Sequence, residues 1–239
     1  MERKVAPKRN DKKTGKSKNN QFDFSEVYRQ LRTNIEYSSF EGDVQVINIT
    51  STNPAEGKSS VTSNLAMVCV AKYANVLLID CDLRKPVQHK IFKVSNKVGL
   101  SNLMKNVDKF DVYDDSYFQK FKDNESDGKL YVLTSGTRIP NPQEMLASSR
   151  FKTLIEKLRE RFDFIILDCP PISAVSDAIP VSHVADGTIY VISAKDTNKN
   201  DVKSALTQLQ RNGANVLGCV LTKVEATAKH YYSYYYSND

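Results

Sequence analysis

Long apolar stretches and cysteine motifs are both missing from this chain of 239 residues. No segment approaches the ~18 consecutive apolar residues that a membrane-spanning helix needs, and the N-terminus lacks the apolar run of a secretory signal peptide. The cysteines form no CxxC pair or His-rich cluster, so we expect buried, reduced thiols rather than disulfides or a zinc site: Cys69, Cys81, Cys169 and Cys219. These absences predict a cytoplasmic protein.

Negative charge is scarce near the N-terminus. Residues 1–20 contain eight Lys or Arg against only Glu2 and Asp11, without apolar periodicity. We therefore expect residues 1–21 to be a disordered basic segment. Such a segment is either a solvated tail or an attachment to an anionic surface such as a lipid membrane. No recognisable nucleic-acid-binding fold accompanies it, so we expect no nucleic acid partner.

The rest of the chain alternates between apolar runs and helical patterns. Six runs are predicted strands: Val44–Ser51, Asn75–Asp80, Lys129–Ser135, Phe162–Asp168, Gly187–Ser193 and Ala214–Thr222. Five segments are predicted helices: Phe24–Ser38, Ser59–Tyr73, Ser149–Arg161, Ser176–Val184 and Asn200–Arg211. Nearly continuous apolar strands are typical of a parallel sheet with helices on both faces. The expected class is a single α/β domain with its functional groups at the carboxyl edge of the sheet.

One stretch does not fit the alternation. Residues 106–128 are polar and irregular, and we expect a surface excursion. Its aromatic side chains are the candidates for anchoring it to the body of the domain: Phe110, Tyr113, Tyr117, Phe118 and Phe121.

The most informative motif is NPAEGKSS, at residues 53–60, between a predicted strand and a predicted helix. A glycine-containing loop in that context presents backbone amides to phosphate oxygens. Lys58 would place a positive charge on the terminal phosphates, and the Ser59 hydroxyl is suited to Mg²⁺. Thr52 stands where the pattern GxxxxGK[ST] has its first glycine, so this is a deviant Walker A loop. The expected nucleotide contacts are Pro54, Ala55, Glu56, Gly57, Lys58, Ser59 and Ser60.

Two carboxylates follow the second predicted strand, in LLIDCDLRKP at residues 77–86. Asp80 and Asp82 cannot both be ordinary core residues, because unpaired buried charges cost several kcal/mol. Bound Mg²⁺ would neutralise them, or one of them would be a general base that accepts a hydroxyl proton. The structural alternative is an ion pair with Arg84 or Lys85.

A third acidic residue ends another apolar strand, in IILDCPP at residues 165–171. Asp168 there fits the Walker B role, in which a carboxylate holds Mg²⁺ directly or through water. The two prolines end the strand and fix the outgoing loop. The order GKS, DxD, DxPP along three apolar strands indicates a site for ATP and Mg²⁺.

Together these motifs resemble those of the bacterial tyrosine kinases of the CpsD/CapB type, which serve capsule or exopolysaccharide synthesis. The resemblance runs from about Phe24 to the C-terminus and includes TSGTRIPNPQEML at residues 134–146 and the tyrosine-rich end HYYSYYYSND. It implies a P-loop fold related to partition-type ATPases and unrelated to eukaryotic protein kinases, whose HRD and DFG signatures the chain lacks. The implied parts are a kinase domain, residues 22–224, and a flexible tyrosine-rich tail, residues 225–239.

The resemblance also implies roles for single residues. Lys58 would contact phosphates, and Ser59 and Asp82 would hold Mg²⁺. Asp168 would support the metal, and Asp80 would activate the acceptor hydroxyl, although sequence leaves the division between Asp80 and Asp82 open. The implied acceptors are Tyr231, Tyr232, Tyr234, Tyr235 and Tyr236. The implied partners are a membrane polysaccharide co-polymerase, which activates the kinase and holds it at the inner face of the plasma membrane, and a cognate tyrosine phosphatase.

Glu26, Arg29 and Arg32 are spaced by three in EVYRQLR and share one face of the first predicted helix. This pattern is either intrahelical ion pairing on a solvated face or, by the resemblance, a contact in which Glu of one chain meets Arg of the next. We favour the second interpretation. Such a head-to-tail contact closes into a ring if the rotation permits, and it would bring each tail near a neighbour's active site for phosphorylation in trans.

Two residues depart from related patterns. Ala55 stands where many relatives carry glycine and would cost on the order of 1 kcal/mol if its φ is positive. Asn53 stands where partition-type ATPases carry a signature lysine. We therefore favour a tyrosine autokinase over two alternatives: a partition- or septum-positioning ATPase, and a weakly nucleotide-binding scaffold of polysaccharide assembly.

Overall fold

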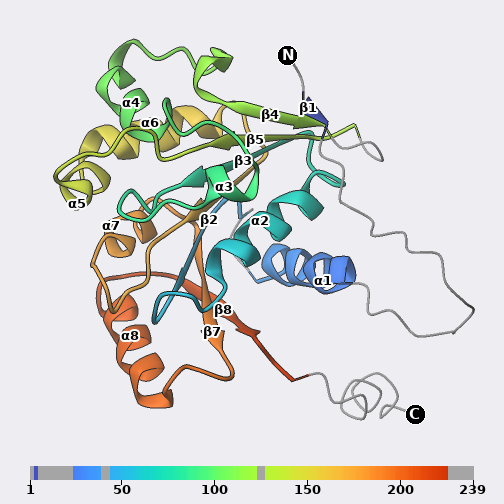
Figure 1. The fold of residues 1–239 in the computed structure, drawn as a ribbon, viewed down its shortest axis with the longest axis vertical. Coiled ribbons are helices and arrows are strands. Elements are labelled where there is room, and N and C mark those ends of the chain that lie inside the picture. Colours follow the sequence, from blue (N-terminus) through green and yellow to red (C-terminus); the bar gives the residue numbers. More distant parts are fainter. Residues whose placement is uncertain (1–2, 5–23, 39–43, 123–126, 226–239) are drawn as a thin grey trace, which may run out of the picture.

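The computed structural model describes residues 3–4, 24–38, 44–122 and 127–225. Its centre is an eight-stranded sheet in the order β1-β4-β5-β3-β6-β2-β7-β8 (Figure 1). Every neighbouring pair is parallel except β4 and β5. The strands are β1 (Arg3–Lys4), β2 (Val46–Ser51), β3 (Asn75–Asp80), β4 (Gln119–Lys122), β5 (Lys129–Leu133), β6 (Phe164–Asp168), β7 (Gly187–Ser193) and β8 (Val216–Thr222).

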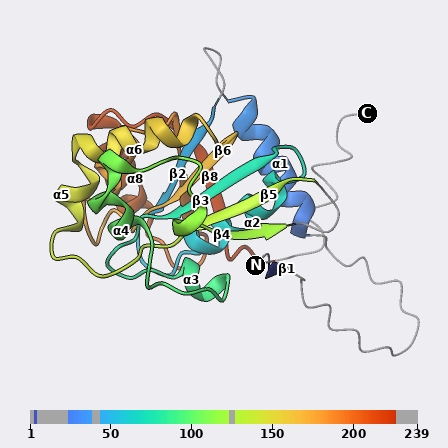
Figure 2. The same cartoon turned by 90° about the horizontal axis from the view of Figure 1, so that it is seen from above.

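Helices cover both faces of the sheet (Figure 2). One face packs against α1 (Phe24–Glu36) and α2 (Lys58–Cys69). The opposite face packs against α4 (Leu100–Lys105), α5 (Pro142–Leu146), α6 (Ser149–Arg159), α7 (Ala178–Ser182) and α8 (Lys199–Arg211). The short helix α3 (Gln88–Ile91) and two 3-10 turns, η1 (Val107–Lys109) and η2 (Asp115–Tyr117), lie in the connections. The predicted α/β class, with helices on both faces, is confirmed.

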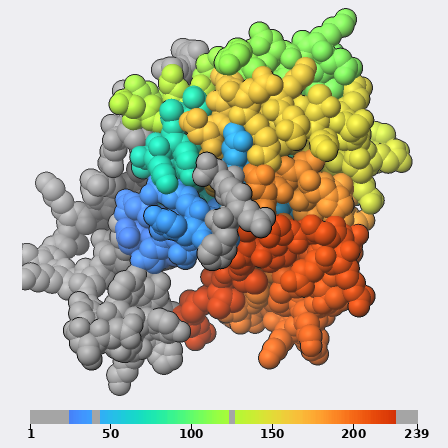
Figure 3. Space-filling model, turned by 180° about the vertical axis from the view of Figure 1, so that it is seen from behind, coloured from blue at the N-terminus to red at the C-terminus, as the bar shows by residue number. Residues whose placement is uncertain are grey.

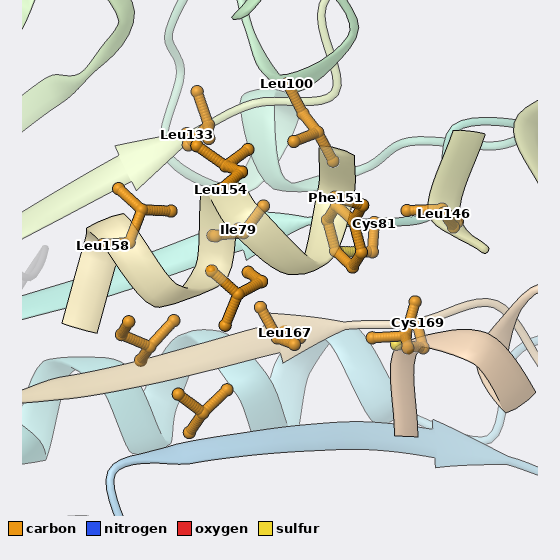
Figure 4. Close-up of a cluster of buried hydrophobic side chains, with 14 of the residues drawn as sticks. Ile79, Cys81, Leu100, Leu133, Leu146, Phe151, Leu154, Leu158, Leu167 and Cys169 are labelled. Carbon is orange, nitrogen blue, oxygen red and sulfur yellow. The ribbon is translucent and has the colours of Figure 1, made fainter. Parts of the chain in front are cut away.

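Each face of the sheet has its own apolar core. On the α6 side, Leu154 and Leu158 lie over Ile79 of β3 and Leu167 of β6, all completely buried (Figure 4). On the α2 side, Leu65 is completely buried in a second cluster with the other faces of β2, β3 and β6. Burial on both faces explains why these strands read as continuous apolar runs.

The six predicted strands and five predicted helices are all present, with ends that differ by at most four residues. The exception in burial is β8, which is the edge strand and is only partly covered. Its Cys219 is exposed, so the prediction of a buried thiol is wrong there, although it holds for the other three cysteines. An edge strand has one neighbour and cannot be covered as fully as a central one.

The excursion at residues 106–128 is more regular than expected, because β4 adds to the sheet as an antiparallel partner of β5. Phe110, Phe118 and Phe121 are buried and Tyr117 packs on the core, as predicted. Tyr113 is 68% exposed, and the contact of its ring is at the surface, with the Arg161 guanidinium 6.0 Å from the ring centre. Of the basic N-terminal segment, only β1 is described, where it lies beside β4.

Sheet register places the sequence motifs at one edge. Asp80 of β3 is the direct partner of Asp168 of β6, and β6 pairs in turn with β2. The loop at residues 52–57 leaves the carboxyl end of β2 beside them. No helix among the described residues is long and apolar enough to cross a membrane.

Candidate functional site

The loop between β2 and α2 contains two residues with positive φ angles. Gly57 has φ 95° and caps the N-terminus of α2, which begins at Lys58. Ala55 has φ 64°, so the position that raised doubt in the sequence does lie in the left-handed region. That conformation costs an L residue about 1 kcal/mol, and the surrounding contacts must supply it.

Contacts from distant strands hold this loop. The Thr52 hydroxyl lies 2.7 Å from the Tyr190 hydroxyl of β7. Thr222, the last residue of β8, donates from Oγ1 to the carbonyl oxygen of Glu56 at 2.5 Å. Thr197 donates to a carboxylate oxygen of Glu56. The Thr52 hydroxyl therefore binds the neighbouring strand where the common motif has a glycine.

Lys58 is the centre of the site. Its Nζ lies 3.2 Å from Oγ of Ser59, 3.4 Å from Oδ2 of Asp82 and 3.6 Å from Oδ1 of Asp168. Burial lowers the pKa of Lys58, but the charges of Asp168, Asp82 and Asp80 outweigh it, so the pKa is raised and the ammonium is retained. The three side chains predicted to bind metal thus all contact one positive charge.

Asp80 is fully enclosed. It has no exposed surface, and its carboxylate accepts hydrogen bonds from the backbone N–H groups of Asp82 at 3.2 Å, Val87 at 3.1 Å and Gln88 at 3.0 Å. Burial and the nearby charge of Asp168 raise the pKa of Asp80 to about 8. Asp80 therefore organises the loop after β3.

Asp82 is also buried, with only 5% of its surface exposed. Like Asp80, it has partners that explain its burial. Asp82 contacts Lys58 and accepts from the backbone N–H of Lys85 at 2.9 Å. Arg84 binds neither Asp80 nor Asp82. Its guanidinium instead forms a two-bond pair with the buried Asp177, at 2.8 and 3.1 Å, so the alternative of a local pair with Arg84 is not observed.

One residue of the site, Gln88, belongs to none of the motifs recognised in the sequence. Gln88, at the start of α3, is completely buried, and its Nε2 donates to Oδ2 of Asp168 at 2.7 Å and to the carbonyl oxygen of Ser59 at 3.1 Å. Its position two residues after the RKP segment gave no sequence signal. Only the folding of α3 against the sheet edge brings it to the phosphate loop.

The donor set fits Mg²⁺. Ser59, Asp82 and Asp168 offer hydroxyl and carboxylate oxygens around the position that the Lys58 ammonium faces. Among the described residues, no group of three or more His, Cys, Asp or Glu side chains could hold a metal by itself. Mg²⁺ takes one or two protein carboxylates and completes its shell with water and substrate phosphates. Ser59 and Asp82 or Asp168 would hold it.

The three residues predicted to form the oligomer contact on α1 do not all point to the surface in this single chain. Arg29 Nη1 pairs with Glu26 Oε2 at 3.0 Å on the exposed surface. Arg32 turns inward, where Nη1 donates to the carbonyl oxygen of Val68 in α2 at 2.9 Å and Nε lies 3.6 Å from Glu36. Helix α1 forms part of the molecular surface (blue in Figure 3).

The predicted nucleotide contacts lie in one loop and in the first turn of α2. Pro54, Ala55 and Ser60 are exposed, Gly57 and Ser59 are half-buried, and Glu56 and Lys58 are buried. The five tail tyrosines lie outside the described residues, which end at Glu225.

Comparison with known proteins identifies the family. Residues 44–216 match the family described as AAA domain. The chain is 40% identical over 215 residues to CapB of Staphylococcus aureus, covering 90% of this chain and 91% of that protein. It is 37% identical to the tyrosine-protein kinase YwqD of Bacillus subtilis, with 90% and 87% covered.

Comparison with solved structures agrees with the sequence relatives. The chimerical protein CapA2B2 superposes with a TM-score of 0.74 at 38% identity, over 84% of this chain and 85% of that one. The septum site-determining protein MinD of Pyrococcus horikoshii, at 20% identity and a TM-score of 0.56, shares the fold alone. With its deviant phosphate loop and its Asp80, Asp82 and Asp168 at one sheet edge, the chain belongs to the bacterial tyrosine-protein kinases, a branch of the P-loop fold.

Proposed function

We propose that the chain is an ATP-dependent tyrosine autokinase that phosphorylates the C-terminal tyrosines of neighbouring copies and so regulates capsular or exopolysaccharide synthesis. The observation that carries the proposal is the contact of Lys58 with Ser59, Asp82 and Asp168 beside the phosphate loop. Phosphoryl transfer relies on positioning and on stabilising charge, and these groups are suited to both.

The end of β8 supports the choice of substrate. Thr222 ends β8 and binds the phosphate loop through Glu56. The first acceptor, Tyr231, is only nine residues further along the chain. We expect a tail that follows β8 so closely to reach a neighbouring chain that packs beside this loop.

The transfer step balances simply. The phenol oxygen of the acceptor bonds to the γ-phosphorus, the bond from that phosphorus to the β-phosphate oxygen breaks, and ADP leaves. The phenol proton, with a pKa near ~10, passes to a carboxylate. Bound Mg²⁺ supplies positive charge to the phosphate oxygens.

The burial of Asp80 favours a revised division of roles. A general base must first lie within reach of the proton that it takes, and Asp80 is enclosed by three backbone amides. Asp82, which retains some exposed surface, is better placed to accept the phenol proton. Asp80 would then fix the loop that carries Asp82.

Partners follow from the family. We propose a homo-oligomeric ring through Glu26 and Arg29, activation by the cytosolic tail of a membrane polysaccharide co-polymerase, and reversal by a cognate tyrosine phosphatase. The co-polymerase would also hold the chain at the inner face of the plasma membrane. Addition of about −1.5 to −2 charges per phosphotyrosine would repel neighbouring tails and loosen the ring.

The test is a phosphotyrosine assay on the purified full chain with Mg-ATP, alone and with the activator's cytosolic tail. A signal that disappears in Lys58→Met and on deletion of residues 231–236 supports the proposal. If no phosphotyrosine forms with or without the activator's tail, the kinase proposal is overturned, and the alternative of a polysaccharide-assembly scaffold is favoured. A signal that survives Lys58→Met points to a contaminating kinase.

Transfer between chains is tested by mixing two variants, neither of which can phosphorylate itself. Lys58→Met retains the tail as acceptor, and the chain deleted for residues 231–236 retains the active site. Phosphotyrosine on the Lys58→Met chain supports transfer in trans. Its absence in the mixture, while wild type is labelled, means transfer within one chain.

A further inference from the structure

Gln88 contacts three residues of the candidate nucleotide site: Asp80, Asp168 and Ser59. Its backbone N–H donates to Asp80, and its side-chain amide donates to Asp168 and to the Ser59 carbonyl. The residue is completely buried, so these bonds do not compete with water. One residue therefore links the phosphate loop to both acidic motifs.

The orientation of the Gln88 amide follows from its neighbours. The Asp168 carboxylate and the Ser59 carbonyl are both acceptors, so only the NH₂ side of the amide can face them. That leaves Oε1 on the other side, and it is buried without a hydrogen-bond partner among the described residues. A buried acceptor without a donor is unfavourable, and it is a common mark of a place where water or a ligand belongs.

The Gln88 amide sets the orientation of the Asp168 carboxylate. Its Oδ1 faces Lys58 at 3.6 Å and Thr62 at 3.4 Å, whereas its Oδ2 receives the Gln88 amide at 2.7 Å. The amide therefore fixes which oxygen of Asp168 faces Lys58.

We propose that Gln88 is a positioning residue for Mg²⁺: it orients Asp168 and ties it to the Ser59 segment, so that both metal ligands are held before Mg-nucleotide arrives. Outer residues that hydrogen-bond to metal ligands contribute 10–100-fold to metal affinity in other proteins. This inference rests on the proposed Mg-ATP site.

The test is a Mg²⁺ titration of the binding of a fluorescent ADP analogue to the full chain, in wild type and in Gln88→Met. Methionine keeps the length of the side chain and removes both polar atoms. The Mg²⁺ concentration at half-saturation is expected to rise at least tenfold. Binding of the analogue in EDTA is expected to stay within about twofold, because the amides of the phosphate loop are untouched.

Gln45 offers a matched control. Its Nε2 also donates to two carbonyl oxygens, of Arg159 and Phe162 at 2.8 Å each, but it precedes β2 at the opposite edge of the sheet. Gln45→Met is expected to change stability without changing the Mg²⁺ dependence. Gln88→Asn, which keeps the amide on a shorter side chain, covers the case in which Gln88→Met does not fold, and it should show the same rise.

The outcomes separate the two claims. No Mg²⁺-dependent binding in wild type overturns the Mg-ATP site and this inference together. Normal Mg²⁺ dependence in wild type and in both Gln88 variants overturns the inference alone. An equal loss of binding with Mg²⁺ and in EDTA also overturns it, because Gln88 would then serve only the fold of the loop.

Discussion

Nζ of Lys58 lies 3.4 Å from Oδ2 of Asp82, and this contact joins the phosphate loop to the segment after β3. The same ammonium lies 3.6 Å from Asp168. Two carboxylates that contact the same ammonium would repel one another without a cation between them. Lys58 is therefore the counter-charge of the site as well as its predicted phosphate ligand.

Replacement of this cation should be costly to the fold as well as to activity. Lys58→Met leaves buried carboxylates unpaired, which costs on the order of 3 kcal/mol, and the melting temperature should fall in EDTA. Mg²⁺ should restore part of that loss, because it supplies the missing positive charge. Lys72→Met is the control, since the pair of Lys72 with Glu36 is half exposed and such surface pairs contribute ~0–1 kcal/mol. Equal losses in the two variants would contradict the assignment.

Ala55→Gly tests whether the departure from glycine weakens nucleotide binding. Ala55 already has φ 64°, so the loop has the required conformation before glycine is introduced. Calorimetric titration with Mg-ADP should give affinities within about twofold. Lys93→Gly, at φ 54° and away from the loop, controls for the backbone change. A tenfold gain in affinity for Ala55→Gly alone would mean that Ala55 holds the loop away from its binding conformation.

Gly57→Ala should weaken nucleotide binding more than tenfold. At φ 95°, a side chain is strained, and the new Cβ would lie 3.3 Å from Cγ2 of Thr222. Gly213 has φ 79° with nothing within 4 Å, so Gly213→Ala carries the same backbone strain of about 1 kcal/mol without the contact. Nucleotide affinity should be normal in Gly213→Ala, and a similar loss in both variants would remove any special role for Gly57.

Asp80 predicts a pH dependence of stability. A carboxyl whose pKa is raised from ~3.9 in the unfolded chain to about 8 in the folded chain holds its proton preferentially when folded. Its contribution is therefore greatest below the unfolded pKa, declines as pH rises toward 8, and is constant above. Urea unfolding in EDTA should show Asp80→Asn gaining stability over wild type across that range. A difference that does not vary with pH would contradict the raised pKa.

Asp186 is the control, because its contribution to stability should change with pH in the opposite direction to that of Asp80. Its pKa is lowered, since hydrogen bonds from Arg159 and from the backbone N–H groups of Val46 and Gln45 outweigh its burial. Its contribution to stability is present above the unfolded pKa and is lost as pH falls through the folded one. Wild type should therefore exceed Asp186→Asn at neutral pH, and the difference should shrink in acid.

The proposed ring predicts a charge-swap result. Arg29→Glu places two like charges at the proposed contact and should reduce the oligomer to smaller species in sedimentation velocity. The double variant Glu26→Arg with Arg29→Glu should restore it, because each chain would again present opposite charges. Arg32 is unsuitable for this test, since it binds Val68 within its own chain. Unchanged sedimentation in Arg29→Glu would exclude this face from the contact.

Much of the site was predictable because its chemistry is local in sequence. Lys58 and Ser59 follow the loop that presents them, and Asp80 and Asp168 end apolar strands whose parallel pairing brings them together. Gln88 was not predictable, because its role depends on where α3 packs. The burial of Asp80 was equally hidden, since it rests on backbone amides from residues up to eight positions away.

The sequence by itself determined the α/β class, the phosphate loop and the family, because continuous apolar runs and short motifs encode local structure directly. Only the tertiary structure decided that Arg84 pairs with Asp177 and that Thr222, the last residue of β8, binds the phosphate loop at Glu56. Those contacts join residues far apart in the chain, and their partners are set by how the strands order themselves in the sheet.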